Sequence, residues 1–379
     1  QPPKEPGPDE WASLGRSLSQ PLADSSLCAR EPPHPPPAGG TFPAGEGQKT
    51  ATKDLRRNMK KICLRCAGFL LILALFLGIL SAVFYPKGRG YNDGLENPRI
   101  WAFQAEPKNS LEVLAIGDSL LMCGYSPLDV WTQRGYTGFG CCTGNQRLTQ
   151  SLRMLEAFCE NQSPKVVFLE ADSLYHAIDS QDILRDRVLP LIPALEYHDN
   201  WKIFSPKRFL RAPDYSYLHP QKGTHFLYDR DPQVPEEADS YMENRGERAP
   251  IAGANRRYFR KIARFCREKG IQLVLVSVPS PSNWSYARHS AVQTLAEYWG
   301  LTYLDMNLED LGIDWLTDKS TEGDHLNYLG TQKVSAFLGD YLASTGLLES
   351  HRQDDLGRAW EKAAQAQAEK NREKLEAAQ

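Results

Sequence analysis

Val113-Leu114-Ala115-Ile116-Gly117-Asp118-Ser119-Leu120 is an apolar run that ends abruptly at Gly-Asp-Ser. A short run of β-branched and aliphatic residues predicts a strand, and the glycine permits a sharp turn after it. α/β folds bind ligands at the carboxyl ends of parallel strands, where Ser119 would present its hydroxyl. The alternative interpretation is that Asp118 and Ser119 only cap the helix that follows.

A second polar motif, Asp324-His325, lies far along the chain and opens a helix-like segment. A serine hydroxyl is a weak nucleophile at neutral pH and needs an imidazole base, which a carboxylate holds in the right tautomer. Ser119, His325 and a nearby acid supply these groups. The sequence therefore predicts a nucleophilic serine site.

Strand and helix signals alternate beyond the first motif, which is typical of a parallel sheet covered by helices. The predicted strands are 113–116, 136–141, 166–169, 271–278 and 301–305. The predicted helices are 127–134, 145–160, 255–269 and 285–299. We expect a three-layer α/β/α sandwich with a mainly parallel sheet.

Three segments resemble a known family. Gly117-Asp118-Ser119-Leu120 after a strand, with a late acid and histidine, is similar to the SGNH (GDSL-like) hydrolases, whose fold is flavodoxin-like. Residues 112–119, 163–170 and 323–327 resemble in particular the membrane-anchored bacterial branch related to envelope O-acetylation proteins. The resemblance spans residues 95–345 and implies the same fold and ester chemistry.

The resemblance also implies roles for individual residues. Ser119 would be the nucleophile, His325 the base, and Asp324 the acid that orients the imidazole. The family acid usually lies three residues before the histidine, a position that Glu322 occupies here. Glu322 is therefore the alternative to Asp324.

The oxyanion donors depart from the family pattern. The family takes them from a glycine, which Gly144 matches, and from an asparagine, where this chain has Asp172. An ionised carboxylate cannot donate a hydrogen bond. We therefore expect the donors to be the backbone N–H groups of Ser119 and Gly144, with the side-chain amide of Asn145.

Four residues are expected to contact substrate: Asp118, Asp172, His176 and Trp284. His176 follows the third predicted strand and is the second candidate for an acid/base residue. Trp284 belongs to the proline-rich loop 279–284, which would emerge at the same sheet edge. The alternative is that this loop is only a stiff connection.

An insertion of about residues 176–254 interrupts the alternating pattern with many aromatic residues and prolines. Long loops in compact domains are usually functional lids or are poorly ordered. Aromatic faces with polar neighbours would suit a sugar ring, so we expect the insertion to cover the substrate. The alternative is a flap that shields hydrophobic surface.

The N-terminal part of the chain predicts a membrane anchor. Residues 1–48 are rich in Pro, Gly and Ser and predict a disordered tail, and residues 49–65 are basic. Residues 66–86 carry no charge and are numerous enough to span a bilayer as a helix. The predicted hydrolase domain follows at 87–348.

The position of the basic flank predicts the orientation of this anchor. By the positive-inside rule the tail is cytoplasmic and the C-terminal domain lies outside, in a single-pass protein of the cell membrane that contacts membrane lipid. A cleaved signal peptide is the alternative. Residues 81–85 lack a small-x-small cleavage pattern, which favours a retained anchor.

The C-terminal segment, the net charge and the cysteine spacing complete the sequence analysis. Residues 349–379 predict a charged, mobile helical tail, and the net charge of −3 indicates no nucleic-acid partner. Cys63 and Cys66 have CxxC spacing without a second pair, so we expect no metal and no cofactor.

The sequence thus predicts a membrane-anchored extracytoplasmic serine esterase or acyltransferase. Its expected substrate is an O-acyl, in particular O-acetyl, group on cell-envelope polysaccharide. One alternative is a lipid-ester hydrolase, because the anchor keeps the site near the bilayer. The other is a catalytically inactive binding or assembly protein of the envelope, which the Asp172 substitution makes credible.

Overall fold

Five parallel strands form one sheet within the part of the chain that the structure describes, in the order β2-β1-β3-β4-β5. The structure is a computed structural model and describes residues 47–88 and 94–378. The strands are β1 (Val113–Gly117), β2 (Gly138–Cys142), β3 (Val166–Glu170), β4 (Gln272–Ser277) and β5 (Thr302–Asp305). The predicted fold class is confirmed, and the predicted strand bounds differ by only a few residues.

The register places the ends of the first three strands together. Ile116 of β1 pairs with Cys141 of β2 on one side and with Leu169 of β3 on the other. All residues of these three strands are buried, which explains why the strands are continuous apolar runs rather than alternating ones. The strand order reverses between β1 and β3, and the carboxyl edge at such a point is where α/β sheets bind ligands.

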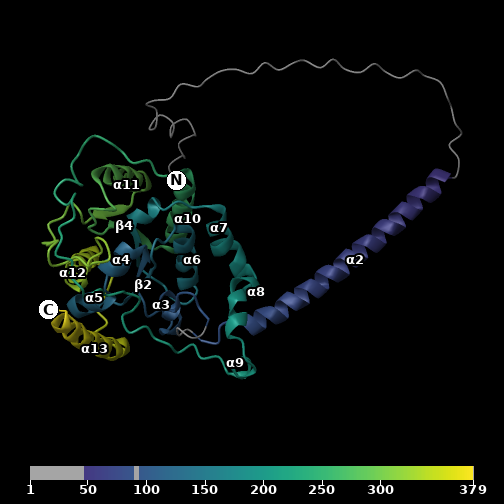
Figure 1. Ribbon diagram of the computed structural model, residues 1–379, viewed down its shortest axis with the longest axis horizontal. Helices are drawn as coiled ribbons and strands as arrows, with labels where there is room; N and C mark the ends of the chain where they lie inside the picture. Colours follow the sequence, from purple (N-terminus) through teal and green to yellow (C-terminus); the bar gives the residue numbers. More distant parts are fainter. Residues whose placement is uncertain (1–46, 89–93, 379) are drawn as a thin grey trace, which may run out of the picture. The chain divides into compact units, whose positions relative to one another are not determined.

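Helices cover both faces of the sheet (Figure 1). They are α3 (Pro98–Trp101), α4 (Ser119–Gly124), α5 (Pro127–Arg134), α6 (Leu148–Phe158), α10 (Gly253–Lys269), α11 (Tyr286–Trp299) and α12 (Tyr328–Thr345), with the short η1 (Ala102–Ala105) and η2 (Ala171–Leu174). Leu114 and Ile116 of β1 pack with α6, α10 and α11, whereas Val113 and Ala115 pack with α4 and α12. Alternate residues of a strand face opposite sides, so one buried strand supplies both cores.

Helix α2 (Gly47–Phe84) contains the predicted anchor. Its stretch Arg57–Phe84 has a mean hydropathy of 2.7 and is long and apolar enough to cross a membrane, by length and composition. The helix begins before the predicted span 66–86, because Lys and Arg in the basic segment 49–65 are good helix formers. The chain divides into two units, one up to Phe76 and one from Leu77 onward. The predicted disordered tail 1–48 lies almost wholly outside the described residues.

The insertion is built from short helices. They are α7 (Ser180–Ile183), η3 (Leu184–Val188), η4 (Leu189–Leu191), α8 (Pro193–Glu196), η5 (His198–Ile203) and α9 (Pro206–Leu210). Proline stands at the first turn of η4, α8 and α9, where it has no hydrogen bond to lose. Irregular chain then leads to α10.

The C-terminal segment differs from the expected mobile tail. Helix α13 (Asp355–Ala377) packs on α5, with Trp360 only 2% exposed and its ring centroid 5.5 Å from that of Trp131. Tyr228 of the insertion donates a hydrogen bond to Asn371 at 2.7 Å. The buried pair of Trp131 and Trp360 therefore holds the helix in place, which the charged composition of the segment did not indicate.

Gly117, the last residue of β1, allows β1 and β3 to approach closely. Its φ is +151°, and a Cβ there would lie 2.3 Å from Cβ of Glu170. We therefore expect Gly117→Ala to lower the free energy of unfolding by about 2–4 kcal/mol. Denaturant unfolding of the full chain in detergent measures this.

Gly253→Ala is the matched control, because Gly253 lies in helix α10 and a Cβ there would meet no atom within 4 Å. It should leave the unfolding free energy unchanged or raise it by about 0.5–1 kcal/mol. Equal losses in the two variants would contradict the close approach of the strands at Gly117.

Candidate active site

Ser119 and His325 meet at the carboxyl edge of the sheet. The Nε2 atom of His325 lies 2.7 Å from Oγ of Ser119, although 206 residues separate them. Ser119 is the first residue of α4, and Asp118 caps this helix by accepting a hydrogen bond from the backbone N–H of Leu120 at 3.0 Å. Asp118 therefore performs the capping role considered above, while the hydroxyl of Ser119 faces the imidazole.

The loop that carries His325 is held by backbone and side-chain hydrogen bonds. The backbone N–H of Ser320 donates to the carbonyl of His325 at 2.9 Å, and Lys319 and Leu326 form an isolated bridge. Asn327 caps α12 and donates through Nδ2 to the carbonyl of Thr317 at 2.8 Å. The imidazole is thus presented by a fixed loop.

A backbone carbonyl orients the imidazole. The Nδ1 atom of His325 lies 2.5 Å from the carbonyl oxygen of Glu322. Because a carbonyl oxygen can only accept, Nδ1 carries the proton, and the lone pair of Nε2 is directed at Ser119. This is the tautomer that a general base requires.

The expected acid does not occupy this position. The carboxylate of Asp324 is buried and accepts hydrogen bonds from Ser280 Oγ at 2.6 Å, Ser282 N at 2.7 Å and Asn283 Nδ2 at 2.9 Å. Asp324 therefore faces the 280–283 loop, whereas the imidazole of His325 faces Ser119. Glu322, the alternative acid, contributes its carbonyl, and its side chain is exposed.

Gly144 and Asn145, the expected oxyanion donors, lie on the loop after β2. The backbone N–H of Thr143 donates to the carbonyl of Gly117 at 3.2 Å, which holds this loop beside the end of β1. Both Gly144 and Asn145 are exposed and line a cavity. The backbone N–H of Ser119 is in the first turn of α4, where helical N–H groups have no partner within the helix.

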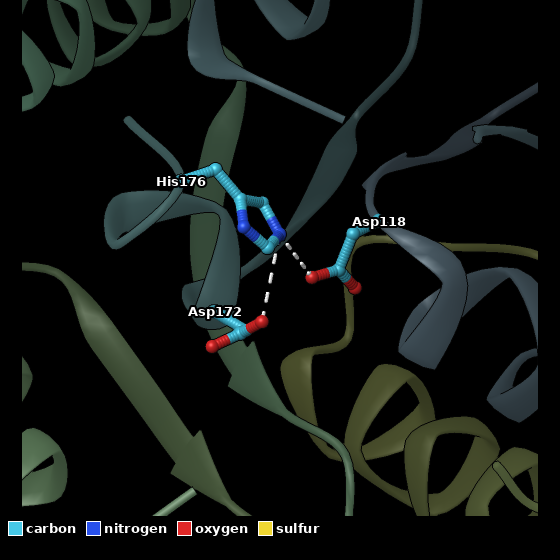
Figure 2. Close-up of side chains that lie close together, drawn as sticks. All are labelled: Asp118, Asp172 and His176. Carbon is cyan, nitrogen blue, oxygen red and sulfur yellow. Dashed lines mark hydrogen bonds and ion pairs between the residues drawn. The ribbon is translucent and has the colours of Figure 1, made fainter. Parts of the chain in front are cut away.

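His176 lies between the carboxylates of Asp118 and Asp172, as Figure 2 shows. Its Nε2 atom lies 2.8 Å from Asp118 Oδ2 and 3.5 Å from Asp172 Oδ2. The three residues are of metal-ligating types, with ligand atoms within 4.8 Å of one another. Arg288 forms an ion pair with the other oxygen of Asp172, so this group is stabilised by ion pairs among protein side chains.

Asp172 is not a simple ionised carboxylate. Burial and the neighbouring charge of Asp118 raise its pKa to about 7, although His176 and Arg288 act in the opposite direction. Burial, followed by Asp118 and Asp172, also raises the pKa of Glu170 well above its ordinary range. These surroundings favour the protonated form of Asp172 more than those of an exposed aspartate do. A protonated carboxyl can donate, unlike the ionised form assumed from the sequence.

Trp284 is a core residue rather than a substrate contact. It is only 3% exposed, its Nε1–H donates to Asp305 Oδ2 at 3.0 Å, and its ring packs on Tyr175 at 6.1 Å between centroids. The prediction that Trp284 contacts substrate is wrong. The simpler interpretation, a stiff connection between strand and helix, describes this loop.

A cavity of about 1120 Å³ borders the site through Met122 of α4, Gly144 and Asn145. Its lining includes two aromatic residues, Trp101 and Tyr197. The charged lining residues are Arg99, Arg147, Arg153, Arg185, Glu96, Asp186, Glu196 and Asp199. The lining therefore carries four cationic and four anionic side chains, so the cavity has no strong net charge. The sequence analysis predicted that the insertion would cover the substrate. It did not predict that residues 94–101 would also line this cavity.

Several solved structures of acylhydrolases are similar to this chain, whereas no protein-family model and no curated protein matches it. They include a GDSL-like lipase from Bacteroides thetaiotaomicron, with 10% identity and a TM-score of 0.33 over 64% of this chain and 94% of that one. The lipase/acylhydrolase from Enterococcus faecalis has 11% identity and a TM-score of 0.32 over 62% and 97%. The function proposed for this chain therefore rests on the geometry of its site.

The raised pKa of Asp172 predicts a pH dependence of stability. The folded state keeps the proton up to about pH 7, whereas the unfolded chain loses it near the ordinary value of 3.8. Between these values the unfolded state binds fewer protons, so the free energy of unfolding should fall as pH rises, and this contribution should level off above about pH 7.

Asp172→Asn should flatten this slope, whatever its effect on absolute stability through the lost ion pair with Arg288. Denaturant unfolding at a series of pH values between the two pKa values measures the slope. Asp310→Asn, at an exposed loop residue, is the control and should keep the wild-type slope. Parallel curves for wild type and Asp172→Asn would contradict the assignment.

Proposed function

We propose that this protein is a membrane-anchored serine esterase or acyltransferase with Ser119 as its nucleophile. The observation that supports this most directly is the contact of 2.7 Å between Ser119 Oγ and His325 Nε2, with the opposite ring nitrogen on a carbonyl. This arrangement activates the hydroxyl without a carboxylate on the ring.

The reaction would proceed in two steps. As Ser119 Oγ attacks the ester carbonyl carbon, His325 Nε2 takes the hydroxyl proton and then gives it to the departing alcohol, which leaves an acyl group on Ser119. Water, or a sugar hydroxyl in a transferase, then attacks the acyl carbon and gives its proton to Nε2, which passes it to Ser119 Oγ as the bond between that oxygen and the acyl carbon breaks. The N–H groups of Ser119 and Gly144 and the amide of Asn145 would bind the oxyanion.

The proposed substrate is an O-acyl, in particular O-acetyl, group of cell-envelope carbohydrate. The cavity beside Asn145 supports this class, because its lining combines two aromatic residues, Trp101 and Tyr197, with hydrogen-bonding groups and side chains of both charges. The resemblance to the envelope O-acetylation branch agrees with it. The site would lie outside the cytoplasmic membrane, with α2 as the anchor.

Two other functions have particular support. A lipid-ester hydrolase is favoured by the anchor, which keeps the site near lipid. A catalytically inactive binding or assembly protein is favoured by the contacts of Asp324, which faces Ser280 and Ser282 rather than the imidazole. Covalent labelling of Ser119 and hydrolysis of acetyl esters separate an active enzyme from the inactive alternative.

A fluorophosphonate should label the 379-residue chain on Ser119. Ser119→Ala should abolish labelling, and His325→Gln should slow it by about a thousandfold or more, because the proton acceptor is lost. Mass spectrometry of the labelled peptide identifies the site. Ser344→Ala, at an exposed serine of α12, is the control and should label like wild type. A folded wild type that stays unlabelled and leaves acetyl esters intact would support the inactive alternative.

Glu322→Gln should change kcat/KM for an acetyl ester by less than about threefold, because the main-chain carbonyl that holds Nδ1 is retained. The pH profile of kcat/KM should keep its lower limb. A loss of about a hundredfold or more would instead show that the carboxylate orients His325 during catalysis. Asp324→Asn should act mainly on the free energy of unfolding, since three donors converge on its carboxylate.

A further inference from the structure

The insertion exposes an unusual set of large apolar side chains within twenty residues of sequence. We call this set the apolar patch, and its members are Leu191, Leu195, Trp201, Ile203, Phe204, Phe209 and Leu210. Their exposed fractions run from 41% for Leu195 and Phe209 to 80% for Leu210. Single exposed apolar residues are normal on protein surfaces, but seven within one short segment, with the rings of Phe204 and Phe209 6.2 Å apart, indicate an interaction site.

The same segment is fastened to the residues at the carboxyl end of α2. Asn200 Nδ2 donates to the carbonyl of Phe84 at 2.7 Å, and the backbone N–H of Ala194 donates to Ser81 Oγ at 3.0 Å. The rings of Tyr85 and Tyr197 are 5.5 Å apart. These contacts lie within the unit that begins at Leu77, so they fix the segment to the point where the apolar helix ends.

Further contacts extend the attachment to α9 and the chain after it. Tyr215 Oη donates to the carbonyl of Pro86 at 3.1 Å, and the backbone N–H of Asp214 donates to the carbonyl of Lys87 at 2.8 Å. The ammonium of Lys87 lies 5.8 Å from the ring centroid of Phe209. These contacts therefore hold the apolar patch beside residues 84–88.

Aromatic and cationic residues are interleaved with the aliphatic ones. Lys202 follows Trp201, Lys207 and Arg208 precede Phe209, and Arg211 follows Leu210. Trp and Tyr favour the membrane–water interface, and Lys and Arg there extend their charges toward lipid head groups. Clustered cations of this kind are attracted to anionic lipids. The composition therefore fits a lipid surface.

We propose that the apolar patch lies in the boundary between head groups and acyl chains of the bilayer that α2 crosses, preferentially one with anionic lipids. The proposal rests on α2 as a membrane anchor. A bilayer is the fitting partner because the same chain enters it where the patch is attached. Amphipathic helices that lie in this boundary bury their apolar face by about 5–10 Å, which sets the depth expected for the patch.

This position has a consequence for the substrate. Residues Glu196–Asn200, which line the cavity beside Asn145, lie between Leu195 and Trp201 of the patch. The wall of the cavity is thus continuous with the membrane-facing surface. The site would receive ester groups close to the head-group layer, on membrane-attached glycan or lipid, rather than groups far from the membrane.

Brominated lipids test the position of Trp201 directly. The 379-residue chain is reconstituted into liposomes whose acyl chains carry bromine near the head group or near the chain end, with and without anionic lipid. The difference in fluorescence between wild type and Trp201→Phe reports Trp201 alone. This difference signal should lose most of its intensity when the bromine lies near the head group and less when it lies near the chain end. Trp315→Phe, at a partly exposed tryptophan outside the insertion, is the control and should give a difference signal that bromine leaves unchanged.

Leu191→Glu/Leu210→Glu should shift the Trp201 emission to longer wavelength and weaken the quenching, while hydrolysis of a soluble acetyl ester stays at the wild-type rate. Trp201 fluorescence that no brominated lipid quenches, in protein that floats with the liposomes, overturns the proposal and points to a protein partner for the patch. Protein that does not float contradicts the anchor. Ser119→Ala should give the wild-type quenching pattern, so a failed esterase assay leaves this test intact.

Discussion

The close approach of β1 and β3 at their carboxyl ends is the constraint on which the site depends. Gly117 has no side chain, and this lets Glu170 occupy the adjoining buried position. The next residues on each strand therefore emerge together at one edge. Asp118 and Ser119 follow β1, and Asp172 follows β3. Parallel pairing of Ile116 with Leu169 sets this register, so a slip of one residue would separate the nucleophile from its neighbours.

The sequence was sufficient to predict the sheet and the pairing of Ser119 with His325. It was not sufficient to predict which group would contact the other ring nitrogen of the histidine. Buried parallel strands are apolar runs that end at glycine or polar residues, and the run 113–120 shows this pattern directly. Which group meets Nδ1 of His325 depends on the course of the backbone through residues 322–325. Side-chain spacing favoured a carboxylate, whereas the turn at Gly323, whose φ is +71°, brings the carbonyl of Glu322 to the ring.

Other differences from the sequence analysis have the same origin, because burial is decided by tertiary packing. Trp284 follows a strand at the expected edge, yet Asp305 of β5 accepts its N–H and draws it into the core. Trp360 is a single large apolar residue in a charged segment, so the sequence shows no apolar periodicity there. Only the fold brings it into contact with Trp131. The raised pKa of Asp172 also depends on tertiary structure, because the fold both buries this carboxyl and brings Asp118 close to it.

The surroundings of His325 determine how an acyl group on Ser119 would be released. Glu322 and Gly323 are exposed, so water can approach the loop that carries the imidazole, and hydrolysis needs no further group. Transfer to a sugar requires that the acceptor displace this water, and the cavity beside Gly144 and Asn145 is the space in which it could bind. An acceptor held there would compete with water through proximity, which is worth far more than an increase in its concentration in solution. Occupancy of this cavity, rather than the chemistry of the serine, would therefore decide between esterase and transferase.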